Sequence, residues 1–375
     1  MDKHKVSLVR CESYDRLEVE AAVKRSVDLL GGIGRFIKPG EKVLLKPNLL
    51  TNVAPETGIV THPEVLRAAI RLIKPVTKNI FCGDSPSVWG EKPDVAKVYE
   101  TTGMKEICRQ EGIEIVYFTH PVMKGIYPLE DFAFKADRLI NIPKFKTHGF
   151  TVLTAALKNL FGLVVGMHKM KVHLDNPKPV HLSKVIVDIY EARKPDLNIL
   201  DGVIAMEGQG PGSTGTLKKM NLVSASADGL SMDMVLARLM ELKVSDIPTN
   251  KEALARGLGI ADPDAIEVLG EKLDDFIAYD FKLPKSSFLS KMPPMPKWAA
   301  ETIVSCLSQK PCSVASKCKL CGLCQKGCPA GAIFERKGKI VFNRSKCILC
   351  LCCQEICPHG AIDIEKGLLL KILGR

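Results

Sequence analysis

The sequence of 375 residues predicts an α/β fold, a mainly parallel sheet flanked by helices, followed by a small C-terminal α+β domain. Strand-like and helix-like segments alternate over residues 1–283, which is typical of α/β domains. Nine of the fourteen cysteines fall between Cys318 and Cys357. The proline-rich residues 284–305 separate the two regions and predict a linker with a short helix. Residues 306–375 are therefore expected to form the second domain.

The elements of the first domain follow from the spacing of its apolar residues. The segment 15–33 has helical apolar spacing and ends at glycines. Asp228 is expected to be the N-cap of a second helix, residues 228–242. The expected strands are residues 5–10, 42–50, 79–87, 113–118, 137–142, 197–206, 219–226 and 265–270. The expected helices are residues 15–33, 62–76, 93–112, 150–163, 181–194 and 228–242.

The cysteines of the second domain form two runs, "CKLCGLCQKGCP" at 318–329 and "CILCLCCQEICP" at 347–358. Each run has the spacing C-x2-C-x2-C-x3-C-P of bacterial ferredoxins, in which the fourth cysteine of one run ligates the cluster of the other. The pattern therefore predicts two 4Fe–4S clusters. The first cysteine set comprises Cys318, Cys321, Cys324 and Cys357. The second cysteine set comprises Cys347, Cys350, Cys353 and Cys328.

Zinc and disulfides are the alternatives for these cysteines. Structural zinc is usually held by two separated pairs of ligands, and disulfides are rare in a chain expected in the cytosol. Cys352, Cys306 and Cys312 lie outside the spacing and are expected to be packed thiols, although a third cluster remains an alternative.

The net charge of +11 is unevenly distributed. Residues 306–375 hold 12 Lys+Arg against 4 Asp+Glu, whereas residues 1–305 hold the other 41 and 38. Each oxidised cluster with its four thiolates carries about two negative charges, so the clusters offset part of this excess. A docking face for ferredoxin or another acidic, low-potential electron carrier is the second explanation. Nucleic acid is not an expected partner, because only Phe334 and Phe342 could stack on bases.

No apolar stretch approaches the ~20 residues that a membrane helix needs. The closing segment 367–375 is too short to span a membrane, and the N-terminus has no apolar region typical of a signal peptide. We therefore expect a cytoplasmic protein without a membrane span.

Polar residues follow several of the predicted strands. Because ligands of parallel sheets gather at the carboxyl ends of the strands, these residues are expected to converge on one rim. They include Lys46, Asn48, Asp84, Asn141, Asp201 and Glu207. Neither a G-x-G-x-x-G fingerprint nor a P-loop is present. The glycine-rich segment 208–212 is compatible with a plain turn or with a ligand loop.

The segment "PKFKTH" places Lys144, Lys146 and His148 in an expected loop, beside the start of a helix near Thr151. Lysines and helix N-termini both favour anions, so the segment predicts an anion-binding or proton-donating site. Lys158 and Asn159 lie further along that helix. A solvated charged loop is the alternative. Three further histidines are expected to have surface or supporting roles: His168, His173 and His181.

The motifs "LLKPNLL", "GDSPS", "INIPKFKTHGFTVLTAALKNLFG", "ILDGVIAMEGQGPG" and "SASADGLSMD", with the double cysteine run, resemble the domain-of-unknown-function family numbered 362. The resemblance covers nearly the whole chain and implies iron–sulfur binding but no defined reaction. It also implies a set of pocket residues: Lys46, Asn48, Asp84, Lys144, Lys146, His148, Lys158, Asn159, Asp201, Glu207 and Asp233.

These features together predict an iron–sulfur oxidoreductase, a ferredoxin-linked reductase that passes single electrons to an anionic, unsaturated substrate in the α/β domain. Catalytic roles are expected for Lys144, Lys146, His148, Lys158, Asp84, Asp201 and Glu207. Binding roles are expected for Lys46, Asn48, Asn159 and Asp233. Whether a flavin or an additional metal takes part is left open, and exposed clusters favour an anaerobic host. The alternatives are an electron-transfer protein without a substrate and a non-redox enzyme with structural or sensing clusters.

Overall fold

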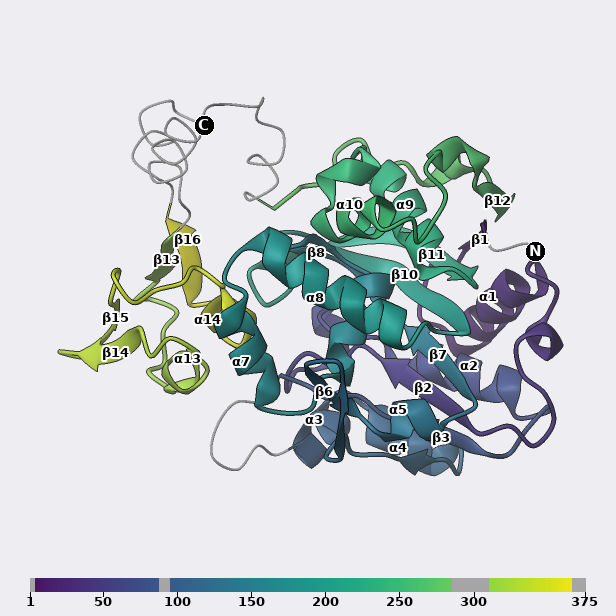
Figure 1. The fold of residues 1–375 in the computed structure, drawn as a ribbon, viewed down its shortest axis with the longest axis horizontal. Helices are drawn as coiled ribbons and strands as arrows, with labels where there is room; N and C mark the ends of the chain where they lie inside the picture. The colour runs from purple at the N-terminus through teal and green to yellow at the C-terminus, as the bar shows by residue number, and fades with distance from the viewer. Residues whose placement is uncertain (1–3, 88–94, 285–309, 366–375) are drawn as a thin grey trace.

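The computed structural model describes residues 4–87, 95–284 and 310–365. A large sheet with helices on both faces forms the α/β part, and a small module of short strands and helices projects from it (Figure 1). The predicted linker from residue 285 onward lies outside the described residues, as do Cys306 and the closing segment 367–375.

The large sheet has the strand order β12-β1-β11-β10-β7-β2-β3-β4, and β8 and β9 extend it from β10. Six of its nine strand pairings are parallel, which confirms the predicted mainly parallel sheet. The strands are β1 (Lys5–Arg10), β2 (Val43–Pro47), β3 (Ile80–Cys82), β4 (Glu114–Ile115), β7 (Arg138–Ile142), β8 (Lys144–His148), β9 (Val152–Thr154), β10 (Leu197–Gly208), β11 (Gly215–Ser226) and β12 (Glu267–Gly270).

Two apolar layers hold helices against the two faces of this sheet. Along β2, Val43 and Leu45 pack in the layer formed with α1 and α2, whereas Leu44 packs in the layer formed with α8 and α9. The alternation follows from the two-residue period of a strand. The helices are α1 (Arg16–Asp28), α2 (Pro63–Ile73), α3 (Val95–Thr101), α4 (Met104–Gln110), α5 (Phe132–Lys135), α6 (Ala156–Asn159), α7 (His168–Asp175), α8 (Pro179–Ala192), α9 (Gly229–Leu239) and α10 (Pro248–Ala255). A separate hairpin pairs β5 (Pro121–Lys124) with β6 (Tyr127–Glu130).

Several predicted elements are wrong in type or extent. The single helix expected at 93–112 is two helices, α3 and α4, because Gly103 interrupts it with a left-handed backbone at φ 76°. The helix expected at 150–163 begins only at Ala156, and a 3-10 turn over Leu160–Leu163 completes it. The helix α7 was not predicted.

The prediction that "PKFKTH" is a loop is also wrong, because the segment forms strand β8, which pairs with β10 in parallel and with β9 in antiparallel. Lys144, Lys146 and His148 alternate along β8 with Phe145 and Thr147, so these three side chains share one face. All five residues are buried. Lysines in a buried strand need internal hydrogen-bond partners, which the sequence pattern does not reveal.

The C-terminal module is the small α+β unit that the cysteine runs predicted. Strand β13 (Lys310–Ser313) pairs with β16 (Ile362–Glu365), and β14 (Ile333–Arg336) pairs with β15 (Lys339–Phe342). Its two helices are α13 (Leu323–Lys326) and α14 (Cys352–Glu355). The repeat is visible in matching N–H···S bonds, since Ala332 N donates to Cys328 Sγ at 3.2 Å and Ala361 N donates to Cys357 Sγ at 3.3 Å.

The module packs on the α/β part through α14, beside α7 (Figure 1). The β10–β11 loop meets it there. Ser213 Oγ donates to the carbonyl of Cys357, and a Cβ on Gly212 would lie 3.0 Å from the carbonyl oxygen of Glu355. The absence of a side chain at residue 212 therefore allows the two backbones to approach closely. In the described part of the chain, no helix combines the length and apolar character needed to cross a bilayer.

The carboxylate of Asp233 fixes the start of α6, where it accepts hydrogen bonds from Ala156 N at 2.7 Å and Leu157 N at 3.1 Å. Asp233→Ala would leave both buried donors without a partner, so we expect a loss of about 2–4 kcal/mol in the free energy of unfolding. Chemical denaturation measures this loss. The matched control is Asp15→Ala, which removes a cap from the exposed start of α1 and is expected to cost about 1 kcal/mol. Equal losses in the two variants would contradict this role of Asp233.

Candidate functional site

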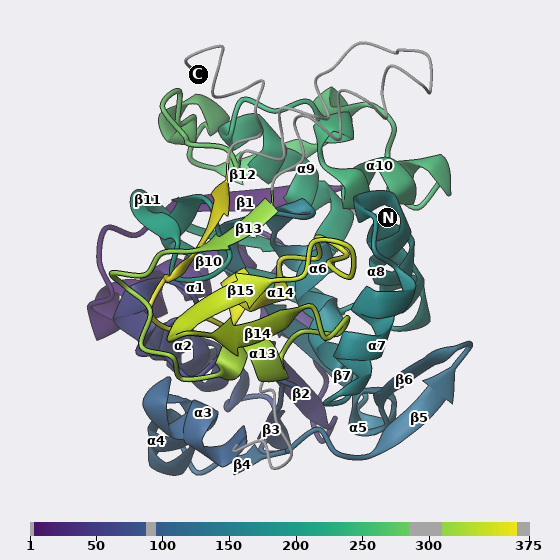
Figure 2. The same ribbon diagram turned by 90° about the vertical axis from the view of Figure 1, so that its left-hand side faces the viewer.

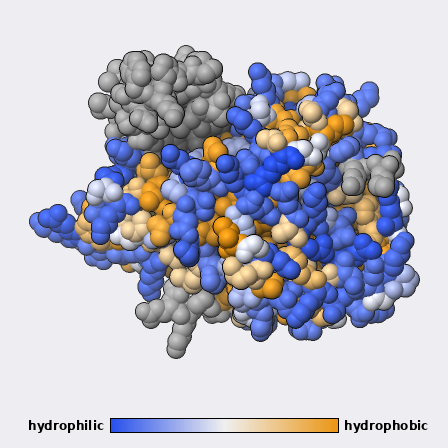
Figure 3. All heavy atoms as spheres, viewed as in Figure 1, coloured by the Kyte–Doolittle hydropathy of each residue, from blue (hydrophilic) through white to orange (hydrophobic). Residues whose placement is uncertain are grey.

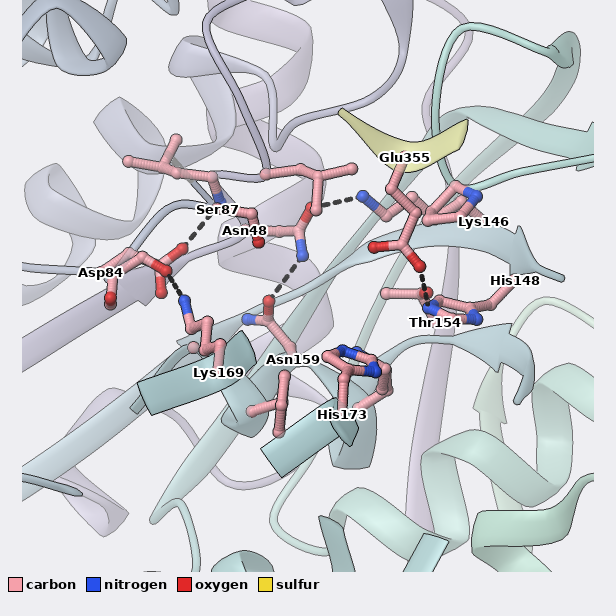
Figure 4. Close-up of a pocket in the computed structure, with 17 residues that line it drawn as sticks. Asn48, Asp84, Ser87, Lys146, His148, Thr154, Asn159, Lys169, His173 and Glu355 are labelled. Atoms are coloured by element: carbon pink, nitrogen blue, oxygen red, sulfur yellow. Dashed lines mark hydrogen bonds and ion pairs between the residues drawn. The ribbon is translucent and has the colours of Figure 1, made fainter. Parts of the chain in front are cut away.

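A cavity lies where the ends of β2 and β8 meet α6, α7 and, from the C-terminal module, α14 (Figure 4). We call it the central cavity. Its empty volume, including the open mouth, is about 540 Å³. Such a space suits a small ligand. Glu355 of α14 contributes to its wall, so the cavity is shared between the α/β part and the cysteine-rich module.

One wall contains the buried ion pair of Lys46 and Asp84, whose Nζ and Oδ1 atoms are 2.8 Å apart. The other carboxylate oxygen of Asp84 accepts a hydrogen bond from Leu49 N at 2.8 Å. Burial lowers the pKa of Lys46, and the charge of Asp84 opposes that shift. Gly162 packs directly over this pair. The pair closes the base of the cavity and leaves little net charge there.

A chain of amides connects this wall to β8. Lys146 Nζ donates to Asn48 Oδ1 at 2.7 Å and to the carbonyl of Ile59 at 2.6 Å. Asn48 Nδ2 then donates to Asn159 Oδ1 at 2.8 Å. Because none of these acceptors is a carboxylate, burial lowers the pKa of Lys146 to about 7. Lys146 can therefore bind an anion or exchange a proton near neutral pH.

His148 joins the α/β part to the module. Its Nδ1 accepts hydrogen bonds from the backbone N–H groups of Phe150 and Thr151 at 3.0 and 3.2 Å. The ring proton must therefore be on Nε2, which lies 3.2 Å from Glu355 Oε1. Burial lowers the pKa of His148, although Glu355 opposes the shift. The ring is thus held as an oriented hydrogen-bond donor to α14.

The facing wall supplies donors without carboxylate partners. Lys158 Nζ lies 4.6 Å from the centre of the Phe161 ring and makes no ion pair with the described residues. Lys169 Nζ donates to the carbonyl of Ser85, and burial lowers its pKa to about 7. His173 Nδ1 and Thr154 Oγ1 are buried with no hydrogen-bond partner among the described residues. Buried donors left unsatisfied are costly, so this wall is suited to an anionic ligand.

The predicted pocket residues divide into two groups. Asn48, Asp84, Lys146, His148, Lys158 and Asn159 line the central cavity, and Lys46 lies behind Asp84. The other four lie elsewhere: Lys144, Asp201, Glu207 and Asp233. The convergence expected for all of them on one rim therefore holds only for the first group.

Each of the four residues outside the cavity makes a hydrogen bond or ion pair that accounts for its position. Lys144 Nζ contacts Asp201 Oδ2 at 2.9 Å and the hydroxyl of Tyr14 at 2.6 Å, in a separate buried cluster. Glu207 binds the backbone N–H of Lys282 at 2.9 Å and its ammonium at 3.1 Å. Asp233 caps α6. These contacts stabilise the fold and leave the groups little capacity to bind a ligand.

The sequence interpretation missed Lys169, Thr154 and Glu355, and it gave His173 only a supporting role. Lys169 and His173 are four residues apart on α7, so a helical interpretation of that segment would have placed both on one face. His168 and His181 are exposed, as expected. Pro211 of the glycine-rich segment also lines the cavity. Glu355 carries no local signal, because only the packing of the module brings it to the cavity.

The cysteines of the first cysteine set lie together in the structure. Cys318, Cys321, Cys324 and Cys357 line one small cavity, together with apolar side chains such as Leu323 and Ile340. The pKa of Cys324 is raised to about 11, mainly by burial and to a smaller extent by the neighbouring thiols of that set. Cys353 of the second cysteine set is likewise surrounded by the other members of that set. Four cysteines beside an apolar space have the donor chemistry of an iron–sulfur cluster, although no three His, Cys, Asp or Glu side chains of the described residues are arranged to hold a metal ion.

Comparison with known proteins gives the family. Residues 43–238 match the family model described as a domain of unknown function, DUF362. The chain belongs to this family. In this DUF362 protein, residues 340–363 also match the 4Fe-4S binding domain, which supports at least one 4Fe–4S cluster and an electron-transfer function.

The DUF362 protein is 34% identical over 297 residues to a thylakoid-associated protein of Synechocystis, over 75% of this chain and 91% of that protein. Among solved structures, the lactate racemase apoprotein of Thermoanaerobacterium thermosaccharolyticum matches 61% of this chain and 56% of its own, with a TM-score of 0.35 and 13% identity. A protein of Thermotoga maritima matches 53% and 52%, with a TM-score of 0.33 and 11% identity. The expected cytoplasmic location stays a prediction.

The packing of Gly162 on the ion pair can be tested by substitution. A Cβ at this position would lie 2.2 Å from Asp84 Oδ1 and 2.5 Å from Lys46 Nζ, so Gly162→Ala must separate the pair or move the turn. We expect a loss of about 1–3 kcal/mol in the free energy of unfolding. The matched control is Gly34→Ala, since a Cβ there would meet nothing within 4 Å. An unchanged denaturation midpoint for Gly162→Ala would refute the tight packing.

Proposed function

We propose that this protein is an iron–sulfur reductase that transfers single electrons to a small anionic, unsaturated substrate bound in the central cavity. The observation that carries the proposal is the position of Glu355, which lines the cavity and lies two residues from Cys353. A ligand in the cavity is therefore next to α14, which contains Cys353 of the second cysteine set. A 4Fe–4S cluster there would supply electrons one at a time at low potential.

The composition of the cavity wall supports an anionic ligand. Lys146, Lys158 and Lys169 have no carboxylate partner within hydrogen-bond distance, and Glu355 is directed to His148. An anion held by these ammonium groups would offset the cost of burying them. A carboxylate or a phosphate has this chemistry, and the unpaired His173 and Thr154 could donate to it.

Reduction of one double bond consumes two electrons and two protons. Reduced ferredoxin, or another low-potential carrier, is the proposed source of the electrons. Lys146 and Lys169 are suited to supply protons because each has a pKa of about 7. His148 positions α14 through Glu355, and its Nε2 proton is directed to that carboxylate. The proposed catalytic residues thus keep Lys146, add Lys169, and no longer include Lys144 and Asp201.

The proposal includes two clusters, one for each cysteine set. The first set would receive electrons and the second would pass them to the cavity.

The two alternative functions require different features of the structure. An electron-transfer protein without a substrate needs no cavity lined by unpaired donors. A non-redox enzyme has no need of cysteines beside its ligand. Both features of the central cavity therefore favour the reductase.

The test uses the full-length protein, reconstituted with iron and sulfide without oxygen and reduced by one equivalent of dithionite per cluster. Small unsaturated carboxylates and phosphate esters are then added, and reoxidation is followed by visible absorption with product analysis by mass spectrometry. We expect one class to reoxidise the protein, and Lys158→Ala to slow this by about 10²–10³-fold. Lys184→Ala, on the exposed side of α8, is the control with unchanged rate.

Two results would overturn the proposal. Reoxidation at equal rates in wild type and Lys158→Ala would place the reaction outside the cavity. Anion binding in the cavity without reoxidation by any compound would favour the non-redox enzyme.

The affinity for anions should depend on pH. Lys146 and Lys169 are cationic below about pH 7 and lose their protons above it. The bound anion favours the protonated lysines, so affinity should be high below pH 7 and fall as the pH rises. Sulfate is a suitable probe because its charge is constant in this range. By calorimetry we expect binding at least about tenfold weaker at pH 9 than at pH 6.

Lys169→Met is the matched variant for this measurement, since it should bind more weakly at pH 6 and show a smaller pH dependence. Sulfate affinity that is constant or rises with pH would contradict the assignment of these lysines.

A further inference from the structure

The positive charge of the C-terminal module is concentrated in one half of it. From Lys310 to Ile340 the chain has seven basic residues and one acidic residue, Glu335. From Val341 to Glu365 it has two basic and three acidic residues. If the basic residues only balanced the charge of two similar clusters, the two halves would be expected to resemble each other. The asymmetry therefore needs a further explanation.

The basic half is the half that faces away from the sheet. In the view of Figure 2, α13, β14 and β15 lie in front of the α/β part, toward the viewer. Helix α14 lies on the opposite side of the module, against the central cavity. Figure 3 shows hydrophilic residues over the projecting end of the module. The basic half is thus the part of the module that a partner can reach.

We call this surface the outer face. Its basic side chains are all exposed, and none makes an ion pair with the described residues: Lys317, Lys319, Lys326, Arg336, Lys337 and Lys339. Cation clusters without internal partners repel each other, which is a cost that an acidic partner would relieve. The charge of this face is therefore available for recognition.

The outer face also contains a cysteine of the first set and apolar anchors. Cys321 is exposed, whereas all members of the second set are buried or half-buried. Leu320 and Phe334 are 40% and 41% exposed. An open groove beside Cys318 is lined by Leu320 and other apolar side chains. A few apolar contacts within a charged rim are typical of small, transient interfaces.

We propose that the outer face docks a small acidic ferredoxin, which delivers electrons to the first cysteine set. The inference rests on the proposed function, because it requires a cluster in that set. Each event oxidises the ferredoxin by one electron and reduces the protein by one electron, and no proton or bond is exchanged. Electrons then have a direction through the module, from Cys321 at the surface to α14 at the central cavity.

The test measures binding of an acidic 2Fe–2S ferredoxin to the full-length reconstituted protein by calorimetry, at low and at high ionic strength. Added salt screens exposed charges, so we expect affinity to fall steeply. Lys326→Glu/Lys339→Glu should weaken binding at low salt by at least about tenfold. Neither residue is a cysteine ligand and both side chains are exposed, so iron content should equal that of wild type.

Lys184→Glu/Lys251→Glu is the control, because it changes the net charge equally but on the exposed surfaces of α8 and α10. This variant should bind ferredoxin within twofold of wild type. Equal weakening in both variants, salt-independent binding, or no binding by wild type would each overturn the proposed docking site.

Sulfate affinity, measured on the same samples, separates the two proposals. If ferredoxin binding is weakened only by the outer-face substitutions and no sulfate binds, docking is supported and the proposed anion site in the central cavity is rejected. Sulfate binding without ferredoxin binding would do the reverse.

Discussion

The contact between His148 and Glu355 couples the two parts of the molecule. It joins the end of β8, which pairs with β10 and β9, to α14 of the cysteine-rich module. The imidazole is fixed from behind by two backbone N–H groups, so it can direct its other nitrogen only toward α14. Together with the hydrogen bond from Ser213 to the carbonyl of Cys357, this contact fixes the position of the cysteines relative to the central cavity.

The buried lysines impose a second constraint. Lys46 has a carboxylate partner, and its charge is largely neutralised. Lys146 and Lys169 instead bind amide and carbonyl oxygens, which satisfy their N–H groups without cancelling their charge. Burying these charges without a counter-ion lowers the stability of the fold. A bound anion would supply the missing counter-charge, so the arrangement is reasonable for a ligand-binding site. The separate Lys144–Asp201–Tyr14 cluster shows the contrasting, fully paired case.

The module has an inside and an outside because its two halves, although alike in cysteine spacing, differ in their surroundings. The inner helix α14 packs closely on the glycine-containing backbone of the α/β part, since a Cβ on Gly212 would lie 3.0 Å from the carbonyl oxygen of Glu355. The outer half meets solvent and, between Lys310 and Glu365, carries seven of the nine basic residues. The two halves thus share their cysteine spacing and differ in the residues outside the ligand positions.

Sequence patterns alone predicted the class of the fold, which the structure confirms, and several residues of the central cavity, and the cysteine spacing predicts two ligand sets. Strand and helix periods follow from local burial, and cluster ligands follow from a fixed spacing, so both can be predicted from neighbouring residues. Asn48, Asp84, Lys146 and His148 were found because strand ends of a parallel sheet meet at one edge. The ion pair of Lys144, the cap that Asp233 provides, the buried strand formed by "PKFKTH" and the place of Glu355 in the cavity wall became evident only in three dimensions. Each involves at least one partner more than fifty residues away, which local sequence patterns do not encode.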